Sequence, residues 1–260
     1  MHRFREILPV ACLLGFLAGQ PVEGADFQKS YALGPGSGIK IENVSGNIVV
    51  SGYDGSTVQV KGIKEGRDKD RVEVEDASDS KNLNLKVRYP QNCHCDASIR
   101  FEVQVPRSVS FKFERLSTAS WDIEVHDATG DFRIHSASGN LHVQNVAGVV
   151  HANTASGDVT VTQVEGSVNA DSASGDIAVE ITKLEGNDHG MKVTTASGNV
   201  TVKLPPNPDV EVEISTVSGS VHTDFPIQVH TPEYGPFRLM NWVWELVGSV
   251  LSGRMRSREF

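Results

Sequence analysis

The chain has 260 residues, a net charge of −9, and 34 valines against 14 leucines. β-Branched side chains fit the pleated, half-buried surface of a strand, so this composition favours a β-rich fold. Charged residues make up 22% and glycines number 24, which excludes a disordered polyampholyte and a collagen-like repeat. Because the chain is acidic, it lacks the broad basic face that nucleic-acid binding requires, and we expect no nucleic-acid partner.

Residues 1–25 have the features of a secretory signal peptide. A basic head with Arg3 and Arg5 precedes an apolar run over 7–18, which is too short to cross a membrane. The alternatives are a buried N-terminal helix or a lipid anchor on Cys12, whose preceding residues form a poor lipoprotein box. We expect an extracytoplasmic protein, periplasmic, surface-exposed or secreted, with no transmembrane span in the mature chain.

Residues 26–116 alternate apolar and polar side chains in several runs of irregular spacing. The clearest run extends from Ile99 to Val105. A period of two indicates strands with one buried face. We expect this irregular N-terminal β region to be continuous with the rest of the chain, as wider coils or a small sheet rather than a separate enzyme domain.

Residues 117–230 contain an internal repeat marked by a Ser-Gly pair. Successive glycines lie 18, 18, 23 and 21 residues apart. The glycines of the five copies are Gly139, Gly157, Gly175, Gly198 and Gly219. An outlying copy stands at Gly46, and Trp121 occupies the glycine position one step before the first copy. Self-similarity over this many copies is typical of a stacked repeat protein.

Within each copy, the second and fourth residues after the glycine are almost always apolar, and a second strand follows half a period later. Each unit therefore comprises strand, turn, strand and turn. Eighteen residues cannot hold a crossover helix, so the constant phase predicts an all-β fold, a parallel β-solenoid with coils of about 18 residues. Equivalent residues such as Val143, Val161 and Val179 should form ladders. The alanine before each Ser-Gly pair, as in Ala155 and Ala173, suggests a narrow interior at that corner.

The residue after each glycine is polar in every copy. Four of the five are Asn140, Asp158, Asp176 and Asn199. Because Asn and Asp interchange, we interpret this column as side-chain hydrogen bonding at a turn. A cation site between Asp158 and Asp176 is the alternative, although the paired glycines of calcium-binding solenoids do not occur. We expect no metal, no cofactor and no catalytic residue.

Cys93 and Cys95 are the only cysteines after residue 25. They could form a disulfide in an oxidising compartment, remain as loop thiols, or clip a soft metal. A structural zinc site would need further ligands. Histidines do not supply them, because His142 and His222 share a column but lie four coils apart.

Residues 231–260 differ from the repeat. Leu239, Trp242 and Leu246 fall on one helical face, whereas Trp242, Trp244 and Leu246 alternate as in a strand. Either form could cap the open last coil, whose unpaired edge would otherwise invite aggregation. The arginines that follow leave an interfacial membrane contact of this C-terminal tail as the alternative.

The recurring (S/T)-A-S-G-(D/N)-(V/I)-x-V motif and the segment ENVSGNIVVSGYDG resemble the bacterial adhesin-like family of β-strand-repeat proteins, also called the toast-rack domain. The likeness spans about residues 39–230, and FEVQVPRSVSFKF resembles the family's strand-Pro-strand step into the regular coils. The resemblance implies a β-solenoid without established catalytic residues. The sequence departs from the family pattern at Trp121 and after His230.

No nucleophile elbow, phosphate loop, zinc-protease motif or dinucleotide fingerprint occurs in the sequence. We therefore expect a non-enzymatic exported protein that presents a binding or scaffold surface in the bacterial cell envelope. Its partner would be an envelope protein or a polysaccharide. The alternatives are a carbohydrate-active β-helix enzyme and a regulatory partner of an envelope membrane complex.

Overall fold

The computed structural model describes residues 26–184, 190–206, 211–224, 229–230 and 251–254. The N-terminal strands are β1 (Phe27–Tyr31), β2 (Gly38–Glu42), β3 (Ile48–Tyr53), β4 (Val58–Glu65), β5 (Glu73–Asp76), β6 (Asn82–Arg88), β7 (Ser98–Pro106) and β8 (Ser110–Ser120), with the short 3₁₀ helix η1 (Lys69–Arg71) after β4. The strands that follow are β9 (Ile123–His126), β10 (Thr129–Ser138), β11 (Leu141–Ser156), β12 (Val159–Ser174), β13 (Ile177–Lys183), β14 (Gly190–Ser197), β15 (Val200–Lys203), β16 (Glu211–Ser218), β17 (Val221–Thr223), β18 (Val229–His230) and β19 (Leu251–Arg254).

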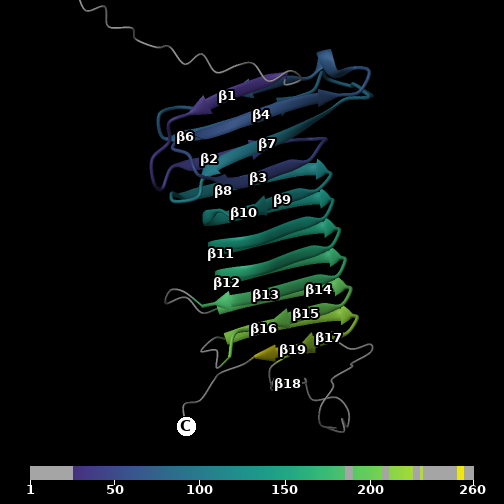
Figure 1. Ribbon diagram of the computed structural model, residues 1–260. Coiled ribbons are helices and arrows are strands. Elements are labelled where there is room, and N and C mark those ends of the chain that lie inside the picture. The colour runs from purple at the N-terminus through teal and green to yellow at the C-terminus, as the bar shows by residue number, and fades with distance from the viewer. Residues whose placement is uncertain (1–25, 185–189, 207–210, 225–228, 231–250, 255–260) are drawn as a thin grey trace, which may run out of the picture.

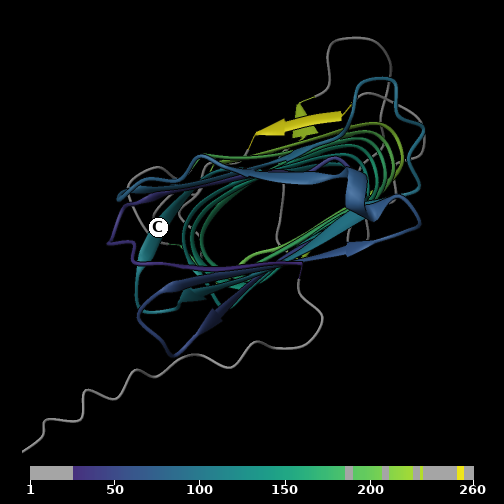
Figure 2. The ribbon, with the colours of Figure 1, turned by 90° about the horizontal axis from the view of Figure 1, so that it is seen from above.

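The strands of the regular part stack in parallel, one coil after the next (Figure 1). Strand β11 pairs with β10 on one side and with β12 on the other, and β12 then pairs with β13 and β14. Figure 2, which looks along the stack, shows the coils superimposed around one elongated interior. The predicted parallel β-solenoid is confirmed.

Equivalent apolar side chains form ladders through the interior. Val143 lies opposite Val161, which in turn lies opposite Val179, and Val202 continues the series. All four side chains are at most 2% exposed. The 18-residue period therefore places each buried valine directly over its counterpart, as the sequence predicted.

The two strands expected within one coil run on as a single strand of 16 residues in β11 and in β12. Each of these strands bends at a residue with left-handed backbone, Asn145 with φ 52° and Gln163 with φ 55°. Residues on both sides of the bend keep their partners on the adjacent coil. Because the bend does not interrupt the pairing, one continuous strand replaces the predicted strand-turn-strand.

The alanines before the Ser-Gly pairs do not line the interior, contrary to the sequence-based expectation. Ala137, Ala155, Ala173 and Ala196 are all exposed. The buried residues at this corner are hydroxyl residues one position earlier: Ser136, Thr154, Ser172, Thr195 and Thr216. Thr154 Oγ1 donates to the carbonyl of Gly139, 3.2 Å away, and the Ser172 hydroxyl donates equivalently to Gly157. These hydroxyls close each coil on itself, and the alanine methyl groups face outward.

The N-terminal strands extend the stack with mixed pairing. Strand β2 is parallel to β6 and β8, and β3 is parallel to β7 and β9. Strands β4 and β1 then add antiparallel beyond β7, and β5 adds antiparallel beyond β6. At the junction with the regular coils, Phe113 stacks on Phe132 with ring centroids 4.5 Å apart.

At the other end of the stack, β19 pairs antiparallel with β16 and with β18. The stretch 231–250, for which helix and strand were alternatives, lies outside the described residues, and so does the predicted signal segment 1–25. In the described part of the chain, no helix has the length and apolar character that a membrane span requires.

Candidate binding surfaces

The glycine column lies at the corner where one coil passes into the next. Gly157, Gly175, Gly198 and Gly219 have φ between 149° and 154°, whereas Gly139 is not in this region. A Cβ atom on Gly157 would overlap the carbonyl group of Gly139 in the neighbouring coil. The column thus combines a backbone angle that side chains disfavour with a close approach between coils.

The column after the glycines bonds one coil to the next. Asn140 Oδ1 accepts a hydrogen bond from the Asp158 N–H at 3.0 Å, and Asp158 Oδ1 accepts from the Asp176 N–H at 2.8 Å. Asp176 and Asn199 repeat the arrangement with the next residues of the column, at 2.6 and 3.1 Å. An amide or a carboxylate oxygen accepts equally well here, which accounts for the interchange of Asn and Asp. Among the described residues, no group of three or more His, Cys, Asp or Glu side chains is placed to hold a metal ion.

Trp121 interrupts the glycine column without breaking this pattern. Asp122 Oδ1 still accepts a hydrogen bond from the Asn140 N–H at 2.7 Å. The tryptophan has φ 122°, is 51% exposed, and donates from Nε1 to Ser45 Oγ at 3.1 Å. A non-glycine residue in such a conformation costs about 1–3 kcal/mol. The fold therefore holds an indole at the surface at a cost in stability.

Cys93 and Cys95 lie in the loop between β6 and β7, with Cα atoms 5.0 Å apart. This separation falls within the range that a disulfide spans, and the bridge remains a prediction. His142 and His222 occupy one column, and Thr160, Ala178 and Thr201 lie between them on the intervening strands. The structure does not bring the two histidines together.

One outward row crosses seven neighbouring strands and consists almost entirely of uncharged hydrogen-bonding side chains. We call it the hydroxyl–amide row: Ser30, Gln59, Gln104, Ser51, His126, Gln144 and Thr162. At the usual strand spacing it extends about 29 Å. Gln104 is exposed and its amide has no hydrogen-bond partner among the described residues, so it is free to bind a ligand.

A hollow of about 430 Å³ lies over the first part of this row. Four members of the row line it, together with charged residues of the adjacent outward row. Those charges are paired, because Glu102 contacts Lys61 at 3.5 Å and Arg100 at 2.9 Å. The hollow therefore offers amide and hydroxyl groups beside a largely neutralised charge cluster, which suits a neutral polar ligand.

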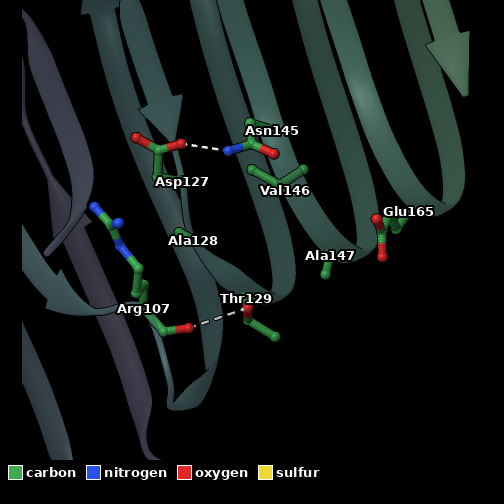
Figure 3. A pocket seen from close by; sticks show the side chains of 8 residues that line it. All are labelled: Arg107, Asp127, Ala128, Thr129, Asn145, Val146, Ala147 and Glu165. Atoms are coloured by element: carbon green, nitrogen blue, oxygen red, sulfur yellow. Dashed lines mark hydrogen bonds between the residues drawn. The ribbon is translucent and has the colours of Figure 1, made fainter. Parts of the chain in front are cut away.

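A second pocket, of about 260 Å³, lies at the bend on the opposite edge of the coils (Figure 3). Asp127, with φ 55°, accepts a hydrogen bond from the Asn145 amide of the next coil. Arg107 and Glu165 lie at opposite ends of the pocket in Figure 3. The Arg107 guanidinium is already engaged, since Nη2 donates to the Gly52 carbonyl at 3.0 Å and Nε lies 3.5 Å from Asp54. The pocket can bind a small polar group, but its charged groups largely satisfy one another.

Sequence reasoning missed both hollows. The bend pocket has a signal in the sequence, because Asp127, Asn145 and Gln163 recur every 18 residues and polar residues tolerate left-handed backbone. The hydroxyl–amide row has none, because its members come from strands whose order along the chain differs from their order in the sheet.

Comparisons with known proteins agree with this fold. A solved structure of a candidate adhesin from Bacteroides fragilis is 16% identical, over 76% of this chain and 96% of its own, with a TM-score of 0.45. A candidate cell adhesion protein from Clostridium sporogenes is 10% identical, over 76% and 98%, with a TM-score of 0.33. A candidate lipid-binding protein from Parabacteroides distasonis is 13% identical, over 76% and 96%, with a TM-score of 0.28.

No curated protein matches the chain. The family model Toastrack DUF4097 matches residues 37–236. This range includes the irregular strands from β2 onward and all five Ser-Gly copies. The chain therefore belongs to the Toastrack DUF4097 family.

Proposed function

We propose that the protein is a non-enzymatic binding scaffold of the bacterial cell envelope, exported from the cytoplasm, and that its hydroxyl–amide row binds a neutral polysaccharide. The observation that carries this proposal is the row itself, with the hollow of about 430 Å³ over its first strands. Sugar hydroxyl groups both donate and accept hydrogen bonds, and amide and hydroxyl side chains do the same without the desolvation cost of a charge.

The solenoid supports this role through its rigidity. Backbone hydrogen bonds between coils fix the spacing of the row, so a polymer finds binding groups that are already in position. An extended polymer can contact several strands at once, and weak individual bonds then add up along the row. Adhesion and scaffolding both require such a surface and no catalytic step.

The experiment compares two matched amide substitutions. Gln104→Ala removes an exposed amide from the row, and Asn153→Ala removes an exposed amide from the other side of the solenoid. Binding of soluble neutral glucans and mannans is measured by affinity electrophoresis. We expect Gln104→Ala to weaken binding about fivefold, the equivalent of one hydrogen bond, and Asn153→Ala to leave it unchanged.

Absence of neutral-glycan binding, or equal loss in both variants, would refute the polysaccharide proposal. Cleavage of the polymer by the unaltered protein would favour the carbohydrate-active enzyme instead. Protease treatment of intact cells, together with fractionation, tests the location. Protein found only in the cytoplasmic fraction contradicts export.

A further inference from the structure

A row of basic side chains crosses four adjacent strands on the side of the solenoid away from the hydroxyl–amide row. We call it the cationic row: Lys40 on β2, Arg115 on β8, Arg133 on β10 and His151 on β11. Lys40 lies opposite Arg115, and Arg133 lies opposite His151. Between the two pairs, β8 carries one additional residue, Glu114. At the usual strand spacing the row extends about 14 Å.

The carboxylates of the protein neutralise only one end of this row. Glu42 lies 3.2 Å from Lys40 and 3.8 Å from Arg115, and it also lies 3.9 Å from Lys86. Arg133 is exposed, and its guanidinium has no hydrogen bond or ion pair among the described residues. One carboxylate thus serves three cations, while the other end of the row is left with unpaired positive charge.

His135 reports the same imbalance. It lies two residues after Arg133 on β10 and is half-buried. Burial lowers its pKa, and the neighbouring Arg115, His151 and Arg133 lower it further. Three acids occupy this side, namely Glu114, Asp131 and Asp171, and they do not reverse the direction of the shift.

Like charges directly opposite each other destabilise a sheet. A chain with net charge −9 has acidic residues available, yet this row is not matched by them. We propose that the cationic row is a binding site for an acidic polysaccharide whose carboxylates pair with its side chains. The arginine forks match carboxylates in geometry, and a linear row matches a linear polyanion better than a single small ion.

Two other polyanionic partners fit the surface less well. A membrane would be expected to meet large exposed apolar side chains, but those of the described residues, Val44, Trp121 and Val217, lie at the Ser-Gly corner. Nucleic acid requires a broader basic face than a single row flanked by carboxylates. The proposal does not depend on the hydroxyl–amide row, since the two sites lie on different sides and each can fail alone.

The test measures binding of polygalacturonate to the full chain by affinity electrophoresis and calorimetry. The double variant Arg115→Gln/Arg133→Gln removes two charges from the row. Its matched control, Lys64→Gln/Lys203→Gln, removes two charges from lysines outside the row, so both variants have the same net charge. We expect the row variant to weaken binding roughly tenfold and the control to change it less than twofold. Binding of the unaltered protein should weaken as salt rises, because salt screens exposed charges.

A third variant tests the sign of the effect. Glu42→Gln removes the carboxylate that competes for Lys40 and Arg115, so polygalacturonate should bind more tightly, by roughly threefold. A purely structural role of these side chains would not produce tighter binding. Urea unfolding of each variant confirms that the fold is intact.

Three results would overturn the proposal. The first is no binding of polygalacturonate, and the second is equal weakening in the row and control variants. The third is tighter binding of phosphatidylglycerol vesicles or single-stranded DNA than of polygalacturonate. Loss of neutral-glucan binding alone bears on the hydroxyl–amide row and leaves this proposal unaffected.

Discussion

The regular coils and the N-terminal strands both bury an apolar interior, but by different means. In the coils, one set of contacts recurs every 18 residues, as in the valine ladder and the corner hydroxyls. The N-terminal part depends on contacts that occur once. Asn43 Nδ2, for example, donates to the carbonyls of Gly46 and Ile99 at 2.9 and 2.7 Å. A repeat spreads its stability over equal units, whereas an end, which has a neighbour on one side only, needs specific long-range contacts.

The largest effect that separates the two regions should come from the aromatic junction. Phe132→Ala removes a fully buried ring that stacks on Phe113, and should cost about 3–5 kcal/mol of unfolding free energy. Val150→Ala, at the same position one coil later, should cost about 2 kcal/mol. Urea unfolding measures both. Equal losses would show that the junction is no more critical than any coil.

The close stacking of coils should be nearly as sensitive. Gly166→Ala forces a side chain onto a residue with φ 146° and against the carbonyl of Gly148, so it should cost about 3 kcal/mol. Gly34→Ala, where a Cβ atom meets open space, is the control from the N-terminal part and should be nearly neutral. Similar unfolding midpoints for the two variants would contradict the steric argument.

The corner hydroxyls should contribute less per residue. Thr154→Val preserves shape but removes the donor to the Gly139 carbonyl, at a cost of about 1 kcal/mol. Thr162→Val, on the outward hydroxyl–amide row, serves as the control. If Thr154→Val unfolds at the same urea concentration as its control, the hydroxyls do not help to close the coil.

Trp121 should be the exception, a site where substitution stabilises the protein. Trp121→Gly restores the residue of the repeat and relieves the strain at φ 122°, with a gain of about 1 kcal/mol. Trp121→Ala keeps a side chain in the same backbone conformation and should not share the gain. A destabilised Trp121→Gly would mean that the indole contact with Ser45 outweighs the strain.

The smallest difference should appear under acid. Burial alone would raise the pKa of Asp76, but hydrogen bonds from Lys29, Ser78 and Tyr31 outweigh it and hold the pKa at about 2. Because the folded pKa lies below that of the unfolded chain, the contribution is full above pH 4 and declines as the pH falls toward 2. Hydrogen exchange should therefore show β1 and β5 loosening before the coils over this range. Uniform loosening would contradict this order.

Several features of the fold follow from local sequence. A period of two with a constant phase of 18 residues leaves parallel stacking as the simple solution, and the valine ladder and the family assignment confirm it. The corner was predicted wrongly, because Ala155 is apolar and Thr154 is polar. Apolarity alone would bury the alanine, but the hydroxyl is buried instead, since it can donate to a carbonyl of its own coil.

The binding surfaces could not be predicted in the same way. Ser30, Gln104 and Gln144 join one row only because β1, β4, β7, β3, β9 and β11 lie side by side in that order. The cationic row likewise combines Lys40 with Arg115, 75 positions apart in the chain. Periodicity specifies which face of a strand is buried, because that depends on adjacent residues. Which strands become neighbours where the spacing is irregular depends on long-range packing, and that pairing alone assembles the two surfaces.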